Sequence, residues 1–182
     1  MEITLRPLRV ADADVIARWF TDPVDLAQWA GPDIDFPLTR MHFETWISEH
    51  SGGRSRACYA ALGSAFDVIG TFQLVHDAKN RAVRISRFGI APEQRGNGFG
   101  RNLLAFILAK AFDELEAHRI ELQVSTENLR ARRLYERAGF VHEGTARESC
   151  YVDGVWRSSD TMSLLRAEWQ PAWEKASSLA VA

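Results

Sequence analysis

A glycine-rich segment between a predicted strand and a predicted long helix constrains this chain more than any other feature. The segment runs from Gly89 to Gly100, and Gly96, Gly98 and Gly100 alternate with other residues in its second half. Glycine lets the backbone turn so that its N–H groups converge, and it has no Cβ to keep a ligand away. The first turn of the following helix adds unpaired N–H donors and the positive end of the helix dipole. The segment therefore predicts a binding site for a pyrophosphate group.

The residues around the segment limit which class of pyrophosphate-containing ligand can bind. A nucleoside triphosphatase loop needs Gly-Lys-Ser/Thr, but Gly100 is followed by Arg101 and Asn102. A dinucleotide fold places its glycines after the first strand of a βαβ unit, whereas this segment lies in mid-chain. A glycine-rich turn that binds nothing remains as the simpler alternative.

Apolar periodicity predicts strands and helices that alternate along the chain. The predicted strands are Ile3–Leu8, Arg56–Leu62, Val68–Val75, Val83–Ala91, Ile120–Val124, Val141–Val152 and Val155–Leu165. The predicted helices are two N-terminal ones capped by Asp12 and Thr39, then Phe99–Ala117 and Asn128–Ala138. A short amphipathic tail around Trp169 and Trp173 follows. This order predicts an α/β fold with a mixed sheet.

Composition sets the broad class of the protein. The chain has 182 residues and a formal charge of −2, so we expect a single domain over residues 1–182, with residues 177–182 frayed. No basic stripe points to nucleic acid, and no run is apolar enough to span a membrane. The two cysteines, Cys58 and Cys150, suggest neither a disulfide framework nor a metal site, and they favour a reducing cytoplasm.

The loop resembles the coenzyme A loop of the GNAT superfamily of N-acetyltransferases. Gln/Arg-x-x-Gly-x-Gly/Ala is the pattern of that family, and it is matched here from Arg95 to Gly100. The resemblance implies a mixed central sheet of about seven strands flanked by helices. It also implies that acetyl-CoA is the acetyl donor, and it implies no metal. The residues that it assigns to the cofactor are Phe88, Ile90, Arg95, Gly96, Asn97, Gly98, Phe99, Gly100 and Arg101, mainly through backbone amides.

A second segment strengthens the resemblance. Asn128, Ala131, Tyr135, Gly139 and Phe140 stand at the spacings of the family's Asn-x-x-Ala-x-x-x-Tyr-x-x-x-Gly-Phe pattern. Ala131 and Tyr135 share one helix face. The Tyr135 phenol could protonate the leaving thiolate as a general acid, although an aromatic residue that only packs against the sheet is the simpler alternative. Asn128 is expected both to cap the helix and to bind the pantetheine amide, with Ala131 beside it.

Weaker similarities cover most of the rest of the chain. Residues 144–148, 152–156 and 160–164 resemble the subgroup that acetylates ribosomal-protein N-termini and, in close relatives, polyamines. The resemblance therefore implies a small-molecule or peptide amine acceptor, and it is compatible with a homodimer. We expect the acceptor pocket between the N-terminal helices and the hairpin at Asp153-Gly154, with Asp33, Asp35, Trp29 and Trp156 as candidate contacts.

The general base is less clear from the sequence. Several relatives carry glutamate where this chain has Gln123, so Glu121 on the same strand face is the candidate catalytic base, with a solvated surface carboxylate as the alternative. Ser86 and Glu148 could instead order a water molecule. Without a base, an α-amino group of low pKa is favoured over a lysine or polyamine amine. A binding module that keeps the loop without turnover remains the alternative to an enzyme.

Overall fold

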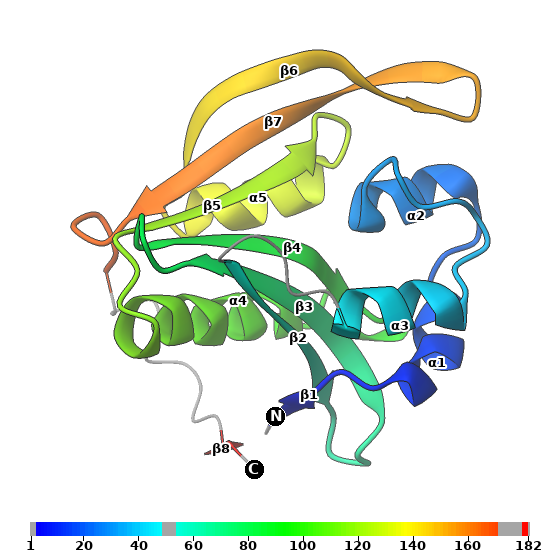
Figure 1. Cartoon of the computed structure of the whole chain (residues 1–182), viewed down its shortest axis with the longest axis horizontal. Coiled ribbons are helices and arrows are strands. Elements are labelled where there is room, and N and C mark those ends of the chain that lie inside the picture. Colours follow the sequence, from blue (N-terminus) through cyan, green and yellow to red (C-terminus); the bar gives the residue numbers. More distant parts are fainter. Residues whose placement is uncertain (1–2, 49–53, 171–179, 182) are drawn as a thin grey trace.

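The structure, a computed structural model, describes residues 3–48, 54–170 and 180–181. Its centre is one mixed sheet of eight strands in the order β6-β7-β5-β4-β3-β2-β1-β8 (Figure 1). The strands are β1 (Thr4–Pro7), β2 (Arg54–Leu62), β3 (Val68–Asp77), β4 (Ala82–Ile90), β5 (Arg119–Ser125), β6 (Val141–Val152), β7 (Val155–Leu165) and β8 (Ala180–Val181). Only the β4–β5 and β1–β8 pairs are parallel. The predicted mixed α/β sheet is confirmed, with β8 as a two-residue addition at its edge.

Two groups of helices cover the two faces of this sheet. The helices are α1 (Ala13–Ala17), α2 (Pro23–Ala30), α3 (Arg40–Ser48), α4 (Phe99–Ala109) and α5 (Leu129–Arg137). A π-helical turn, Lys110–Glu114, extends α4, and 3-10 turns lie at Val10–Asp12 and Pro92–Gln94. One apolar cluster joins α4 and α5 to the sheet, and a second joins the N-terminal helices to it.

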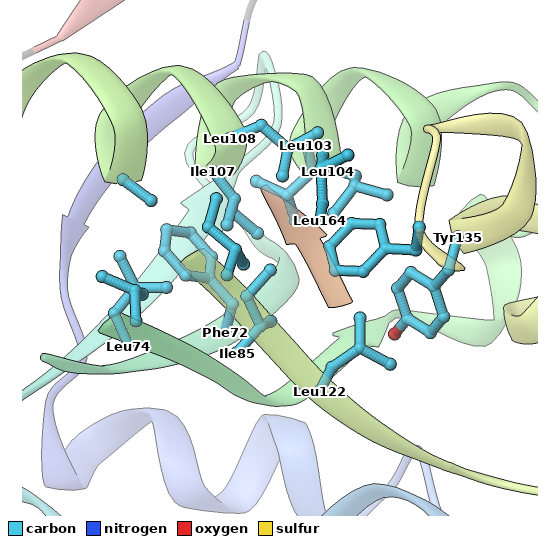
Figure 2. Packing of buried hydrophobic residues seen from close by; sticks show 14 of the residues in the cluster. Phe72, Leu74, Ile85, Leu103, Leu104, Ile107, Leu108, Leu122, Tyr135 and Leu164 are labelled. Carbon is cyan, nitrogen blue, oxygen red and sulfur yellow. The ribbon is translucent and has the colours of Figure 1, made fainter. Parts of the chain in front are cut away.

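The alternation of strand side chains separates these two clusters. On β2, Ala60 belongs to the cluster under the N-terminal helices and Ala61 to the cluster under α4. Figure 2 shows the cluster under α4, where Leu104 and Ile107 of α4 pack over Phe72 of β3. All three side chains are fully buried, and each contributes about 1.5–3 kcal/mol through removal from water. The core therefore fixes α4, and with it the glycine loop, against β3 and β4.

The N-terminal helices differ from the prediction. We expected two helices, but three are present, because α2 lies between them. The Asp22 side chain accepts a hydrogen bond from the Asp25 amide at 2.8 Å, Pro23 occupies the first turn, and Gly31 ends the helix at φ 91°. These are ordinary helix start and stop signals, so the sequence held the evidence for α2.

Asp12 stands at the N-cap position of α1, as predicted, but its side chain makes no capping hydrogen bond to that helix. Instead of capping a helix with its side chain, it is buried, and its carboxylate accepts hydrogen bonds from Arg6 at 2.7 and 2.8 Å and from the Arg9 amide at 2.8 Å. Burial alone would raise the pKa of Asp12, but these bonds and the Arg6 charge hold it below its usual range. Asp12 therefore ties β1 to the first turn.

The C-terminal tail is described only in part. Trp169 stacks on Phe112 with ring centroids 4.9 Å apart, while Trp173 lies outside the described residues. Of the segment expected to fray, residues 177–179 and 182 also lie outside them, and β8 pairs with β1. Gly52 and Gly53, a pair typical of the end of a helix, lie outside the described residues as well. Within the described ranges, no helix has the length and apolar character needed to cross a membrane.

Candidate active site

The site begins where two parallel strands separate. β4 and β5 pair only from Ala82 opposite Arg119 to Ile85 opposite Leu122, and then diverge (Figure 1). Just beyond this point β4 carries a bulge, because the register with β3 moves by one extra residue between Ser86 and Gly89. Beyond Ile85 the edge of β4 that faces β5 is therefore available to an extended ligand.

The glycine loop follows β4 directly. Gly96 has φ 96° and Gly98 has φ 78°, a left-handed conformation that residues with a Cβ rarely adopt. Among the described residues, none of the five amides from Gly96 to Gly100 donates a hydrogen bond, and nothing lies within 4 Å of a Cβ built at Gly96 or Gly98. The Arg95 side chain donates to the Ile90 carbonyl at 3.0 Å and braces the loop. Such a set of converging donors at a helix start fits the pyrophosphate of acetyl-CoA.

The two motifs found in the sequence come together in space. A Cβ built at Gly100 would lie 3.7 Å from Leu134 of α5 and 4.0 Å from Phe88 of β4. The rings of Phe88 and Tyr135 lie 6.2 Å apart. The start of α4, the divergent end of β4 and the face of α5 therefore converge.

Tyr135 lies at the edge of the apolar cluster (Figure 2). It is 6 % exposed, packs against Phe140 at a ring distance of 5.7 Å, and its hydroxyl has no hydrogen-bond partner among the described residues. Burial raises the pKa of the phenol well above its ordinary value. The hydroxyl is therefore protonated at neutral pH and can donate a proton, but it cannot serve as a base.

Asn128 caps α5 as the sequence indicated. Its Oδ1 accepts a hydrogen bond from the Ala131 amide at 3.1 Å. Among the described residues its Nδ2 makes no hydrogen bond, so that group can still donate to a ligand carbonyl. Ala131 lies half-buried, one turn before Tyr135, on the same helix.

An ion-pair cluster joins α5 to β7. Arg132 of α5 donates to the Asp160 carboxylate at 2.7 Å, and the same carboxylate accepts from Thr145 at 2.6 Å and lies 3.1 Å from His142 Nε2. The Asp160 side chain is 1 % exposed. Burial alone would raise the pKa of Asp160, but the Thr145 and His142 bonds and the Arg132 charge hold it below its usual range. The helix that carries Tyr135 is thus fixed to the strand beside β5.

A cavity of about 810 Å³ opens over the sheet face opposite α4. Its floor is formed by residues of β2, β3, β4 and β5, and its walls by α2 and by the β6–β7 hairpin. This volume is in the range of small-molecule sites. The β6–β7 hairpin was expected as one wall, but the wall opposite comes from α2 and the start of the loop after it, and not from the two N-terminal helices that were predicted.

The candidate base lies on the floor of this cavity. Glu121 and Gln123 both line it, but Glu121 is ion-paired through both oxygens, to Arg84 at 2.7 Å and to Arg119 at 3.3 Å. A carboxylate stabilised by two guanidinium groups is a weak proton acceptor. Glu121 as the base therefore remains a prediction, and its contacts weigh against it.

Other candidate contacts lie elsewhere. The described lining contains Trp29 and Ser86 but not Asp33, Asp35, Glu148 or Trp156. Trp156 is 59 % exposed and packs on Tyr151 on the β6–β7 hairpin. The expected pair of loop carboxylates thus does not line the cavity, although, besides burial, the charge of Asp33 helps to raise the pKa of Cys150 in the lining.

Trp29 has a structural task that the sequence did not reveal. Its indole N–H donates to the Arg87 carbonyl at 2.8 Å, and a Cβ at Gly89 would lie 2.8 Å from the same nitrogen. Arg87 sits in the β4 bulge at φ 47°. The glycine at position 89 therefore lets α2 approach the bulge and close one wall of the cavity.

Within the described part of the chain, the site has neither a metal-binding cluster nor an activated thiol. The described residues include no group of His, Cys, Asp and Glu side chains that could hold a metal ion. Cys150 lines the cavity, but burial raises the pKa of its thiol. The arrangement favours direct transfer to an amine over transfer through a cysteine.

Residues 2–141 match the model of the acetyltransferase (GNAT) domain. The chain belongs to this family, and it is an acetyl-CoA-dependent N-acetyltransferase with the GNAT fold.

Individual relatives fall into the two acceptor groups that the sequence resembled. The chain is 26 % identical to a spermidine N(1)-acetyltransferase of Vibrio cholerae, over 92 % of this chain and 95 % of that protein. It is 35 % identical to the putative ribosomal N-acetyltransferase YdaF of Bacillus subtilis, over about half of each chain (52 % and 51 %). A crystal structure of the Vibrio cholerae spermidine N-acetyltransferase with CoA and spermine superimposes with a TM-score of 0.77 at 26 % identity, covering 92 % of this chain and 97 % of that one.

Proposed function

We propose that this protein transfers the acetyl group of acetyl-CoA, bound between β4 and β5, to a primary amine that enters through the cavity. The observation that carries the proposal is the separation of β4 and β5 beyond Ile85, because the five unpaired loop amides lie beyond the end of β4 and the cavity opens over the same strands. Donor and acceptor can therefore meet at the point of separation.

The unpaired amides of Gly96, Asn97, Gly98, Phe99 and Gly100 bind the pyrophosphate in this arrangement. The amides of Arg95 and Arg101, which were predicted to join them, already donate to the carbonyls of Pro92 and Gly98. The backbone of Phe88 and Ile90 pairs with the pantetheine arm as an added strand, and Asn128 donates to a pantetheine amide beside Ala131. The position of its ring, 6.2 Å from that of Phe88, supports the assignment of Tyr135 as the proton donor, and burial keeps its phenol protonated by raising its pKa.

The chemistry balances with these groups alone. The amine nitrogen attacks the thioester carbonyl, the N–C bond forms and the C–S bond breaks. The departing thiolate takes the Tyr135 proton. The amine nitrogen loses its proton to solvent, and solvent then returns a proton to the Tyr135 phenolate. The first step needs an unprotonated amine. Where the enzyme's base is weak, an acceptor whose ammonium group has a low pKa is therefore favoured.

Two acceptor classes have support. A peptide N-terminus or small α-amine is supported by the glutamine at position 123 and by the ion pairs of Glu121. A polyamine is supported by the spermidine acetyltransferases among the relatives. The two free, partly buried thiols support a reducing, cytoplasmic setting.

The test is a screen of amines with acetyl-CoA, read by release of free thiol. We expect release that depends on the amine and exceeds the hydrolysis of acetyl-CoA alone. Acetyl-CoA binding measured by calorimetry is the companion experiment. Tight binding without acceptor-dependent release from any amine would contradict transfer and leave a binding module.

A further inference from the structure

The bulge in β4 turns two successive side chains to the same face of the sheet. Side chains of a regular strand alternate between the two faces. Ser86 and Arg87 are neighbours in the chain, yet both donate hydrogen bonds to the same atom, Oε1 of Gln73, at 3.1 Å and 2.5 Å. The extra residue of the bulge explains this, because a bulge re-aims a side chain of its strand. The position of the Arg87 side chain and the backbone conformation of the bulge are therefore coupled.

The acceptor of these two hydrogen bonds is itself fixed. Gln73 is 1 % exposed, and its Nε2 donates to the sulfur of Cys58 at 3.1 Å. A guanidinium group can only donate, so the amide oxygen of Gln73, and not its nitrogen, must face Arg87. Gln73 is held in one orientation and gives the bulge a fixed point of attachment on β3.

Two tryptophans hold Arg87 from the side of the helices. The guanidinium carbon of Arg87 lies 4.0 Å from the centre of the Trp46 ring, a cation–π contact, and the Trp29 indole N–H donates to the Arg87 carbonyl at 2.8 Å. Arg87 has φ 47°, a conformation that a residue with a Cβ keeps only where its surroundings hold it. Gln73 and Trp46 thus hold the side chain of this residue, and Trp29 holds its backbone.

The bulge lies where the acetyl group would be transferred. It follows Ile85, the last residue of β4 that pairs with β5, and the ring of Phe88 within it is 6.2 Å from the ring of Tyr135. Attack by an amine places negative charge on the thioester oxygen, and a backbone N–H fixed beside that oxygen stabilises the transition state. Misplacement of a reacting or stabilising group by about 1 Å can lower the rate about 100-fold.

We propose that Gln73 and Arg87 are positioning residues, which together with Trp29 and Trp46 hold the β4 bulge in the conformation that directs a backbone N–H at the oxygen of the thioester carbonyl. The inference rests on the acetyl transfer proposed above. In this role Gln73 and Arg87 act through the backbone and not by contact with the acetyl group.

Substitutions at position 87 separate positioning from direct contact. Arg87→Ala and Arg87→Gly both remove the guanidinium group, but only glycine adopts φ 47° without strain. We expect Arg87→Ala to lower kcat about 100-fold and Arg87→Gly only about tenfold, while the acetyl-CoA affinity measured by calorimetry hardly changes. Equal losses of kcat in the two variants would mean that the guanidinium group acts on the substrate itself, and would overturn the inference.

A second set of variants tests the attachment points. Gln73→Leu should lower kcat about 10- to 100-fold, and the milder Trp29→Phe, which removes one hydrogen bond but keeps an aromatic ring, about 3- to 10-fold. Arg6→Gln is the matched control, because it also takes an arginine from a buried acceptor, Asp12, but lies outside the described cavity lining. It should lose stability and keep kcat. A loss of kcat in Arg6→Gln as large as that in Gln73→Leu would reduce the effect to general destabilisation and overturn the inference.

Infrared spectroscopy of bound acetyl-CoA, isotope-labelled in its acetyl carbonyl, gives a readout that needs no turnover. A hydrogen bond weakens the C=O bond, so the band of the wild-type complex should lie below that of free acetyl-CoA. It should return towards the free value in Gln73→Leu and Arg87→Ala, but not in Arg6→Gln. A band without a shift in the wild type, or the same shift in all variants, would overturn the inference and leave acetyl transfer intact. If no amine reacts, acetyl transfer fails, but the band still decides whether these residues position the bulge.

Discussion

The donor side and the acceptor side of this protein share β4 and β5 but are built in different ways. The donor side uses short local patterns: a left-handed glycine loop, free backbone amides and a buried phenol. The acceptor side uses side chains from β2, β3, β4, β5, β7 and α2, with its acids engaged by arginine and amide donors. Backbone groups can bind one constant cofactor, whereas side chains from many elements can be changed separately to fit an acceptor. The following predictions probe this division, from the largest expected effect to the smallest.

Tyr135→Phe should lower kcat by roughly 10²–10⁴, the usual effect of removing a general acid. The affinity for acetyl-CoA should hardly change, because the ring still packs between Phe88 and Phe140. Steady-state kinetics together with calorimetry measure both quantities. An unchanged kcat would assign Tyr135 to packing alone and would weaken the proposed donor side.

Asp160→Asn should lower the free energy of unfolding by about 1–3 kcal/mol, because the charge partner of Arg132 is lost from a buried cluster. The pKa of Asp160 is lowered by folding, so its contribution is present above the unfolded value, 3.8, and is lost as pH falls through the folded pKa.

Denaturant unfolding at several pH values measures this effect. The difference between wild type and Asp160→Asn should be full at neutral pH and should shrink in acid below the unfolded pKa of 3.8. A difference that does not depend on pH would mean that the carboxylate charge does not join α5 to β7.

Gly98→Val should weaken acetyl-CoA binding about tenfold or more, because a side chain at φ 78° strains the loop by about 1–2 kcal/mol and turns its amides away. Gly154→Val is the matched control, since Gly154 has φ 76°, has nothing within 4 Å of a built Cβ, and lies in the hairpin turn. Both variants should lose similar stability, but only Gly98→Val should lose affinity in calorimetry. Equal affinities for acetyl-CoA in the two variants would mean that this loop does not bind the cofactor.

Glu121→Gln should change kcat/KM least, because Glu121 is occupied by Arg84 and Arg119. The wild-type kcat/KM should climb with pH until the acceptor's own solution pKa is reached, since this ratio reports free enzyme and free acceptor. Gln123→Glu should shift the rise of kcat/KM to lower pH, because the side chain at position 123 is exposed and lines the cavity. A wild-type inflection in kcat/KM that disappears in Glu121→Gln would make Glu121 the base.

The sequence alone determined the donor side to a large extent. Positive φ at Gly96 and Gly98, the Asn128 cap and the shared face of Ala131 and Tyr135 all depend on residues a few positions apart, so a pattern in the chain can express them. The strands and the glycine-to-helix transition followed from the same local rules.

Only the tertiary structure decided the acceptor side. The engagement of Glu121 by Arg84, 37 residues away, depends on which strands become neighbours, and so does the placement of Trp29 against Arg87, 58 residues away. Asp33 and Asp35 carry charges suited to an amine, but no local pattern fixes whether a loop carboxylate faces a cavity or solvent. Electrostatic interactions act through space rather than along the chain, so the pairing of Glu121 with two arginines became readable only once the sheet had brought them together.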